Sequence, residues 1–271
     1  MLIIYEGFIK GAHAADGGNS TMSILTFRKT DFIPDNAAQQ KIVIAVDGPA
    51  ASGKGTLAKK MAERLGYAHL DSGALYRAVA MTALEIGADC NLFSDVEPAL
   101  KIVLRNLTPE LLSCPDLRTP EVSEAASKVS AIPQVRDALL KHQRDFAHNL
   151  PAYVGGVVID GRDIGTVVCP DADIKFFVTA SVEERARRRY LELQSEKKEA
   201  SFVKVLEDLK ARDHRDTTRK VAPLVAAEDA YILDTTTLSP SQTLDETISV
   251  IRSRFLSDSA EYPAKASQKA V

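Results

Sequence analysis

The chain has 271 residues, of which 45% are hydrophobic and 26% charged, and its formal net charge is −3. This length suits one large α/β domain, and the composition is that of an ordinary globular protein. The small negative charge provides no basic field of the kind that nucleic-acid-binding proteins carry. Nucleic acid is therefore not expected as a partner. No apolar run approaches the roughly 20 residues of a membrane span, so a membrane is not expected as a partner either.

Residues 1–40 mix Gly, Ser, Asn and Asp without periodicity, and residues 258–271 are mostly small and polar. We therefore expect a flexible N-terminal extension and a C-terminal tail around a domain that spans 41–257. The N-terminus lacks the features of a secretory signal. The three cysteines, Cys90, Cys114 and Cys169, form no C-x-x-C pair. Free thiols in a cytoplasmic protein are expected.

Short apolar runs alternate with amphipathic segments in the predicted domain. The runs are rich in β-branched residues, which is typical of strands buried on both faces of a parallel sheet. They are 41–47, 68–71, 155–160, 174–179 and 230–235. Helices are predicted over 56–65, 74–86, 133–149, 183–194 and 202–215. The alternation predicts an α/β fold, a five-stranded parallel sheet flanked by helices, with ligands beyond the carboxyl ends of the strands.

Helix starts are marked at several points. Ser181 followed by Glu184 is a capping box, and residues 239–242 combine a serine cap, a proline and a glutamine. Thr108-Pro109 and Thr119-Pro120 predict two further starts.

The sequence GPAASGKGT lies between the first predicted strand and the first predicted helix. It matches G-x-x-x-x-G-K, and a glycine-rich turn before a helix aims backbone N–H groups at an anion. We expect Lys54 to reach the outer phosphates of ATP. The expected ATP-binding residues are Gly48, Pro49, Ala50, Ala51, Ser52, Gly53, Lys54, Gly55 and Thr56. The alternative is a glycine-rich turn without a ligand.

Gly55 stands where many such loops have a magnesium-binding hydroxyl, and Thr56 comes one residue late. Mg²⁺ keeps several waters and binds substrate phosphates, so the missing hydroxyl is tolerable. Gly55 argues against a switch GTPase, and the chain has no N-K-x-D guanine motif. The K-G-T ending resembles the loop of nucleoside monophosphate kinases.

Two later strands end in polar residues that suit an anionic acceptor. LDSGALYR places Ser72 and Arg77 after the second predicted strand. The third ends in Asp160, followed by Gly161, Arg162 and Asp163. An aspartate at a buried strand end can hold Mg²⁺ through water, and an arginine can clamp a phosphate. The alternatives are a capping serine with a surface arginine, and a turn that satisfies its own polar groups.

Five motifs recur in order over most of residues 41–235. They are the loop, LDSGALYR, EAASKVSAIPQVRDALLKHQRDF, DGRDIGTVVCPDADIKFFVTAS, and RARRR with ARDHRDTTRKVAPL. Together they resemble bacterial cytidylate kinases, which are P-loop nucleoside monophosphate kinases. The resemblance implies a P-loop NTPase fold with an acceptor-binding insertion at about 89–135 and an Arg-rich lid at about 183–219. It also implies phosphorylation of CMP and dCMP by a monomer, with Mg²⁺ and ATP.

The resemblance implies roles for individual residues. Ser127, Arg136 and Asp163 are expected to read cytosine, whose N4 amino group suits a carboxylate and whose N3 and O2 suit Arg and Ser donors. The sugar would contact Ser72, Arg212 and Asp216, and the acceptor phosphate Arg77, Arg162 and Arg219. Thr56 and Asp160 are candidate metal contacts through water. Adenylate kinases share the loop but lack DSGALYR and DGRDIGTVV.

Arg185, Arg188 and Arg189 are spaced so that they share one helical face. We expect this face to close over the triphosphate. The expected catalytic residues are Lys54, Arg162, Arg188 and Arg189, acting mainly by neutralising charge. A solvated basic face or a nucleic-acid patch is the alternative. His69 and His142 are expected to be structural or exposed.

The segment 89–118 lacks the longer, β-rich insertion of the family's usual members, and is expected to hold one helix, a Thr-Pro start and a proline-rich loop. Two other functions remain open from the sequence. One is a regulator that binds ATP without transferring it, and the other is a kinase of the same fold that prefers UMP or AMP. An assay with several acceptors distinguishes them.

Overall fold

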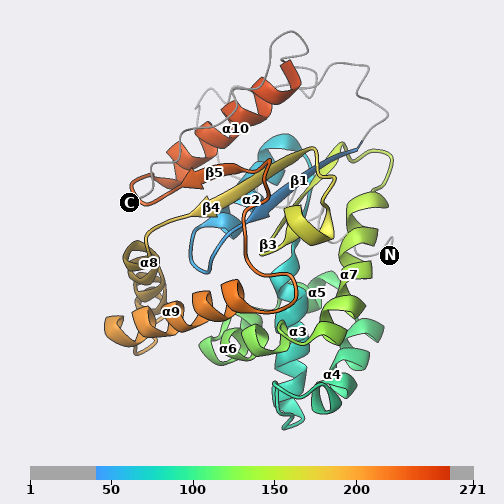
Figure 1. The fold of residues 1–271 in the computed structure, drawn as a ribbon, viewed down its shortest axis with the longest axis vertical. Helices are drawn as coiled ribbons and strands as arrows, with labels where there is room; N and C mark the ends of the chain where they lie inside the picture. Colours follow the sequence, from blue (N-terminus) through green and yellow to red (C-terminus); the bar gives the residue numbers. More distant parts are fainter. Residues whose placement is uncertain (1–40, 257–271) are drawn as a thin grey trace, which may run out of the picture.

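The computed structural model describes residues 41–256. The expected N-terminal extension at 1–40 and the tail at 258–271 lie outside the described residues. The described part is a five-stranded sheet with helices on both faces (Figure 1).

All strand pairs in the sheet are parallel, and the strand order is β2-β3-β1-β4-β5. Each predicted strand is present and begins and ends within one residue of its predicted limits. The strands are β1 (Ile42–Asp47), β2 (Ala68–Asp71), β3 (Gly156–Gly161), β4 (Ile174–Thr179) and β5 (Tyr231–Asp234). β1 is central and buried along its whole length, as a continuous apolar run predicts.

Successive side chains of β1 enter different cores because a strand alternates its faces. Ile42, Ile44 and Val46 pack with α2 (Lys54–Leu65) and α10 (Pro240–Leu256). Val43 and Ala45 pack on the other face with α7 (Pro133–His148) and a π turn, η4 (Ile164–Val168). The sheet is thus covered on both sides.

The remaining helices form two groups beyond the sheet (Figure 1). One group, with a core of its own, contains α3 (Ser72–Glu85), α4 (Phe93–Arg105), α5 (Pro109–Ser113), a 3-10 turn η3 (Pro115–Arg118) and α6 (Pro120–Val129). The other is a hairpin of α8 (Val182–Ser195) and α9 (Phe202–Thr218). The segment 89–118 therefore holds the predicted helix and Thr-Pro start, whereas the predicted proline-rich loop contains the 3-10 turn η3.

The predicted helix starts are confirmed by their hydrogen bonds. Thr108, Thr119 and Ser181 each accept the backbone N–H three residues on. At α10 the box is complete, because Ser239 N–H also donates to the side chain of Gln242 at 2.9 Å. The three cysteines are free, as predicted.

Two predicted helices begin later than the observed ones. α2 begins at Lys54, because Gly53 takes a φ of +87° and acts as its N-cap. α3 begins at Ser72, because the Asp71 carboxylate accepts Ala74 N–H at 3.2 Å. Both starts bring sequence-predicted site residues into a first helical turn.

Candidate active site

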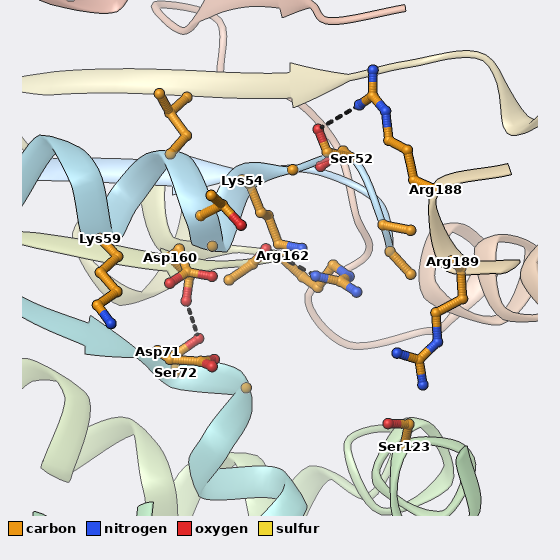
Figure 2. A pocket seen from close by; sticks show the side chains of 18 of the residues that line it. Ser52, Lys54, Lys59, Asp71, Ser72, Ser123, Asp160, Arg162, Arg188 and Arg189 are labelled. Atoms are coloured by element: carbon orange, nitrogen blue, oxygen red, sulfur yellow. Dashed lines mark hydrogen bonds between the residues drawn. The ribbon is translucent and has the colours of Figure 1, made fainter. Parts of the chain in front are cut away.

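A cavity of about 1320 Å³ lies at the carboxyl ends of the strands, between the two helical groups. Figure 2 shows that Lys54, Ser72 and Arg162 converge there from different elements. Its lining includes twelve Lys or Arg and seven Asp or Glu residues, whereas the whole chain has a net charge of −3. Positive charge is therefore concentrated in this cavity, which suits an anionic ligand.

The glycine-rich loop forms one wall of the cavity, and residues 50–56 line it. Gly48 sits where the loop crosses β4, and a Cβ there would stand 2.0 Å from the Val178 carbonyl oxygen. Only glycine allows this approach. Gly48 and Pro49 themselves are not part of the lining.

Lys54 is buried, and its ammonium donates to the Pro49 carbonyl at 3.2 Å. Burial and the nearby charge of Arg162 lower its pKa to about 7. Asp160 lies opposite, with its Oδ2 3.4 Å from the place a Gly55 Cβ would take. Its Oδ1 forms a hydrogen bond with His69 Nε2 at 2.9 Å, and His69 also lines the cavity.

Among the arginines that line the cavity are four on or next to α3, β3 and α9, and two of these four donate hydrogen bonds to carboxylates. Arg77 donates to Asp71 at 2.6 Å, and Arg162 donates to Asp216 at 2.9 Å. The other two are Arg212 and Arg219.

These guanidinium groups retain unused donors. Within residues 41–256, Arg77 Nε, Arg212 Nε and Arg219 Nη2 are buried without a hydrogen-bond partner. Burial, with the charge of Arg162, lowers the pKa of Arg212 to about 10. Unpaired buried donors are costly, so an anion that accepts from them would be bound favourably.

Asp163 and Arg136 form a buried ion pair. Arg219 approaches the other Asp163 oxygen at 3.8 Å, and the Arg136 guanidinium lies 5.6 Å from the centre of the Tyr76 ring. A carboxylate and a guanidinium are thus presented side by side on the wall of the cavity.

Besides Gly48 and Pro49, two residues that the sequence placed at the site do not line the cavity. Ser127 is buried beside the cavity but does not line it, because α6 turns its hydroxyl toward Arg215, which donates to it at 3.2 Å. Arg185 does not reach the cavity either. It is buried and donates to the Ala50 carbonyl at 3.2 Å and to Asp213 at 2.7 Å, so it joins the hairpin to the loop.

The other two arginines of the predicted shared face do line the cavity. Arg188 donates to the Thr235 and Ser52 carbonyls, and Arg189 points toward the opposite wall near Ser123 (Figure 2). The three arginines predicted to share one helical face therefore point in three different directions.

Sequence reasoning missed several lining residues. Tyr76 lies within LDSGALYR, and Arg118 directly precedes the Thr119-Pro120 helix start. Arg118 approaches the Asp71 carboxylate at 3.4 Å. Asp71 was assigned only to a strand. The Arg77 and Arg118 charges hold the pKa of its carboxyl below the ordinary value, although burial opposes them. The position of Asp71, a charged residue at the end of an apolar run, could have indicated that it faces the ligand site.

Neither a metal cluster nor a membrane span is found among residues 41–256. No group of three or more His, Cys, Asp or Glu side chains gathers there in a way that would hold a metal ion. No helix in the same range is long and apolar enough to cross a membrane.

Comparison with known proteins identifies the family. The sequence profile described as cytidylate kinase matches residues 44–253. The chain belongs to the cytidylate kinase family. It is 51% identical over 212 residues to the cytidylate kinase of Paramagnetospirillum magneticum, covering 78% of this chain and 98% of that one. It is 50% identical over 210 residues to that of Rhodospirillum rubrum, covering 78% and 97%.

A third relative, the cytidylate kinase of Granulibacter bethesdensis, is 48% identical over 215 residues, covering 79% of this chain and 99% of its own. The matches cover nearly the whole length of each of these relatives. Among solved structures, a sugar kinase from Janibacter sp. is 14% identical, covering 78% of this chain and 94% of its own, with a TM-score of 0.41.

Proposed function

We propose that this cytidylate kinase family member transfers the γ-phosphoryl group of ATP to CMP and dCMP, and that a single chain is the acting unit. A phosphate oxygen of CMP attacks the γ-phosphorus, the bond to the β-γ bridging oxygen breaks, and ADP leaves. The acceptor phosphate is already ionised at neutral pH, so no general base is required. Catalysis then rests on positioning and charge neutralisation.

The single observation that carries this proposal is a set of buried arginine donors in the same cavity as the glycine-rich loop. Within the described residues, Arg77 and Arg212 each hold a buried N–H without a hydrogen-bond partner, and Arg219 Nη2 lies only within ion-pair distance, 3.8 Å, of Asp163. A protein that only binds ATP has no need of a second anion site across the cavity. In our proposal Arg77, Arg162 and Arg219 hold the acceptor phosphate, and Arg212, Asp216 and Ser72 hold the sugar.

The donor side would be held by the loop from Gly48 to Thr56. Its backbone N–H groups and Lys54 would bind the phosphates, while Arg162, Arg188 and Arg189 would neutralise the charge that develops during transfer. The α8–α9 hairpin is proposed as the lid, and helices α4–α6 as the main part of the acceptor-binding insertion.

Mg²⁺ would fit beside the loop at Asp160. The carboxylate is buried at the end of β3, its Oδ2 faces Gly55, and Thr56 lines the same cavity. Two oxygen ligands acting through water suit a cation that keeps most of its hydration shell. When bound, Mg²⁺ would neutralise charge on the ATP phosphates.

Cytosine recognition is proposed for Asp163 and Arg136. The carboxylate would accept the N4 amino group and the guanidinium would donate to N3 or O2. Ser127 would join them only if its contact with Arg215 opened.

The test is to incubate the purified protein with ATP, Mg²⁺ and one of CMP, dCMP, UMP or AMP, and to measure ADP and the diphosphate product. We expect CDP and dCDP to form much faster than UDP. Absence of CDP above a blank would leave an ATP-binding regulator, and equal rates with UMP and CMP would contradict the role of Asp163.

A further inference from the structure

Asp47 ends the central strand and has no role in the mechanism above. It is 5% exposed and does not line the cavity. Both of its carboxylate oxygens are used, since Oδ1 accepts Ile164 N–H and Oδ2 accepts Gly165 N–H, each at 2.8 Å. These two donors begin the π turn η4, directly after Arg162 and Asp163.

The first N–H groups of a helical turn have no partner within the turn. In η4 the N–H groups of Val167 and Val168 return to the Asp163 carbonyl at 2.9 and 3.1 Å, while the opening donors must find acceptors elsewhere. Asp47 supplies both acceptors from a neighbouring strand. It therefore caps the turn in place of a local residue.

The segment Arg162–Asp163 is held at both of its ends by the same residue. In the parallel pairing of β1 with β3, Asp47 is the register partner of Gly161, the residue before Arg162. Its side chain then holds Ile164 and Gly165, the residues after Asp163. The backbone on both sides of Arg162 and Asp163 is thus anchored at Asp47, while Asp216 and Arg136 contact the two side chains themselves.

The fit around this contact is close. A Cβ on Gly165 would stand 3.1 Å from Lys175 Cδ and 3.4 Å from Asp47 Oδ2. Burial raises the pKa of Asp47 to about 6, against the effect of the two N–H donors, so the carboxylate is kept here at a cost. Because the Asp47 carboxylate is closely packed and accepts from two backbone N–H groups, its side chain is held in a single orientation.

We propose that Asp47 is a positioning residue for acceptor recognition, which fixes the Arg162–Asp163 segment against the strand that leads into the phosphate loop. The inference rests on the proposed function, because it assigns Asp47 to the recognition of CMP. Its consequence is that Asp47 affects CMP more than ATP, although Gly48 of the loop is its chain neighbour.

The test compares Asp47→Asn with Asp173→Asn in the full-length protein. An asparagine turns one acceptor oxygen into a donor that faces another donor, so η4 must move. Asp173 is a matched control, since its Oδ2 accepts Val43 N–H at 2.8 Å near the opposite end of β1. The measurements are KM for CMP, UMP and ATP, the ratio of kcat/KM for CMP over UMP, and urea unfolding.

For Asp47→Asn we expect KM for CMP to rise roughly 10-fold or more and the CMP/UMP ratio to fall, with KM for ATP within about 3-fold. Asp173→Asn should leave all three KM values unchanged. KM values and the selectivity ratio do not depend on the fraction of folded enzyme, so partial unfolding does not imitate the result.

A loss of stability with unchanged KM for CMP would show a merely structural role and overturn the inference. If Asp47→Asn gives no soluble protein, Asp47→Glu, which moves the carboxylate by one methylene against the same two N–H donors, must raise KM for CMP; an unchanged KM overturns the inference equally. Failure of the wild-type protein to phosphorylate CMP would instead overturn the proposed function, so the two failures are distinguishable.

Discussion

At the scale of single residues, we propose that base selectivity depends on Asp163. It is buried between Arg136 and Arg219, and in our proposal it accepts the N4 amino group of cytosine. UMP presents an acceptor at that position. We predict that Asp163→Asn lowers the CMP/UMP ratio of kcat/KM by about 10- to 100-fold, because an amide can donate as well as accept.

The measurement is steady-state kinetics with CMP and UMP, together with the Kd for ATP. Asp208→Asn is the control, because Asp208 is an exposed acid on α9 whose contact is with Lys204. ATP binding should be little changed in both variants. Unaltered CMP/UMP selectivity in Asp163→Asn would remove Asp163 from base recognition.

Lys54 provides a second prediction at this scale. Its pKa is about 7 in the ligand-free protein because burial and Arg162 disfavour the charged form. Bound phosphates favour the charged form and raise this pKa. Above pH 7, ATP binding must therefore take up a proton, and the Kd for ATP should rise with pH.

Calorimetry at about pH 8 in two buffers of different ionisation enthalpy measures this proton. We expect most of one proton per Mg-ATP, since the phosphates of ATP are already ionised there. Lys54→Arg should show no uptake, because arginine stays charged. Equal heats in both buffers for the wild type would contradict the pKa assigned to Lys54.

At the scale of elements, Arg185 decides how the α8–α9 hairpin is joined to the phosphate loop. Its side chain contacts the Ala50 carbonyl of the loop and Asp213 of α9. We predict that Arg185→Met lowers the free energy of unfolding by about 2–3 kcal/mol, because charge-assisted bonds are lost and Asp213 is left without its partner. Urea unfolding followed by circular dichroism measures it.

Arg187→Met is the matched control on the same helix. The Arg187 side chain is 66% exposed and its ion pair is with Glu184, three residues away. Such a surface pair contributes little, so a change of less than about 0.5 kcal/mol is expected. Equal losses in the two variants would show that Arg185 does not fasten the hairpin.

Element types and limits followed closely from the sequence, and the differences have local causes. The apolar runs and cap residues predicted the strands and most helix starts. α2 and α3 begin two residues early because Gly53 and Asp71 are the N-caps. The sequence had marked Ser72 as the alternative cap, yet its hydroxyl donates to the Asp160 carbonyl at 2.7 Å on the neighbouring strand.

At the scale of the whole molecule, a chain of net charge −3 gathers twelve cationic side chains around one cavity. Attraction of this kind is screened by salt. We predict that KM for ATP and for CMP rises several-fold between about 50 and 500 mM KCl. The CMP/UMP selectivity should stay constant, because both acceptors carry the same phosphate. KM values that do not change with salt concentration would contradict the proposal that the positive charge of the cavity attracts the substrates.

The sequence by itself determined the strands, the helices and the phosphate loop, because period, caps and glycine-rich turns act between neighbours in the chain. It also named many of the charged residues that line the cavity, largely through motifs at the carboxyl ends of strands. Only the tertiary structure decided the direction of each side chain. It turned Arg185 and Ser127 away from the cavity and set Asp47 against η4. These outcomes depend on partners 88 to 135 residues away, whose burial and unsatisfied donors appear only after the sheet has formed.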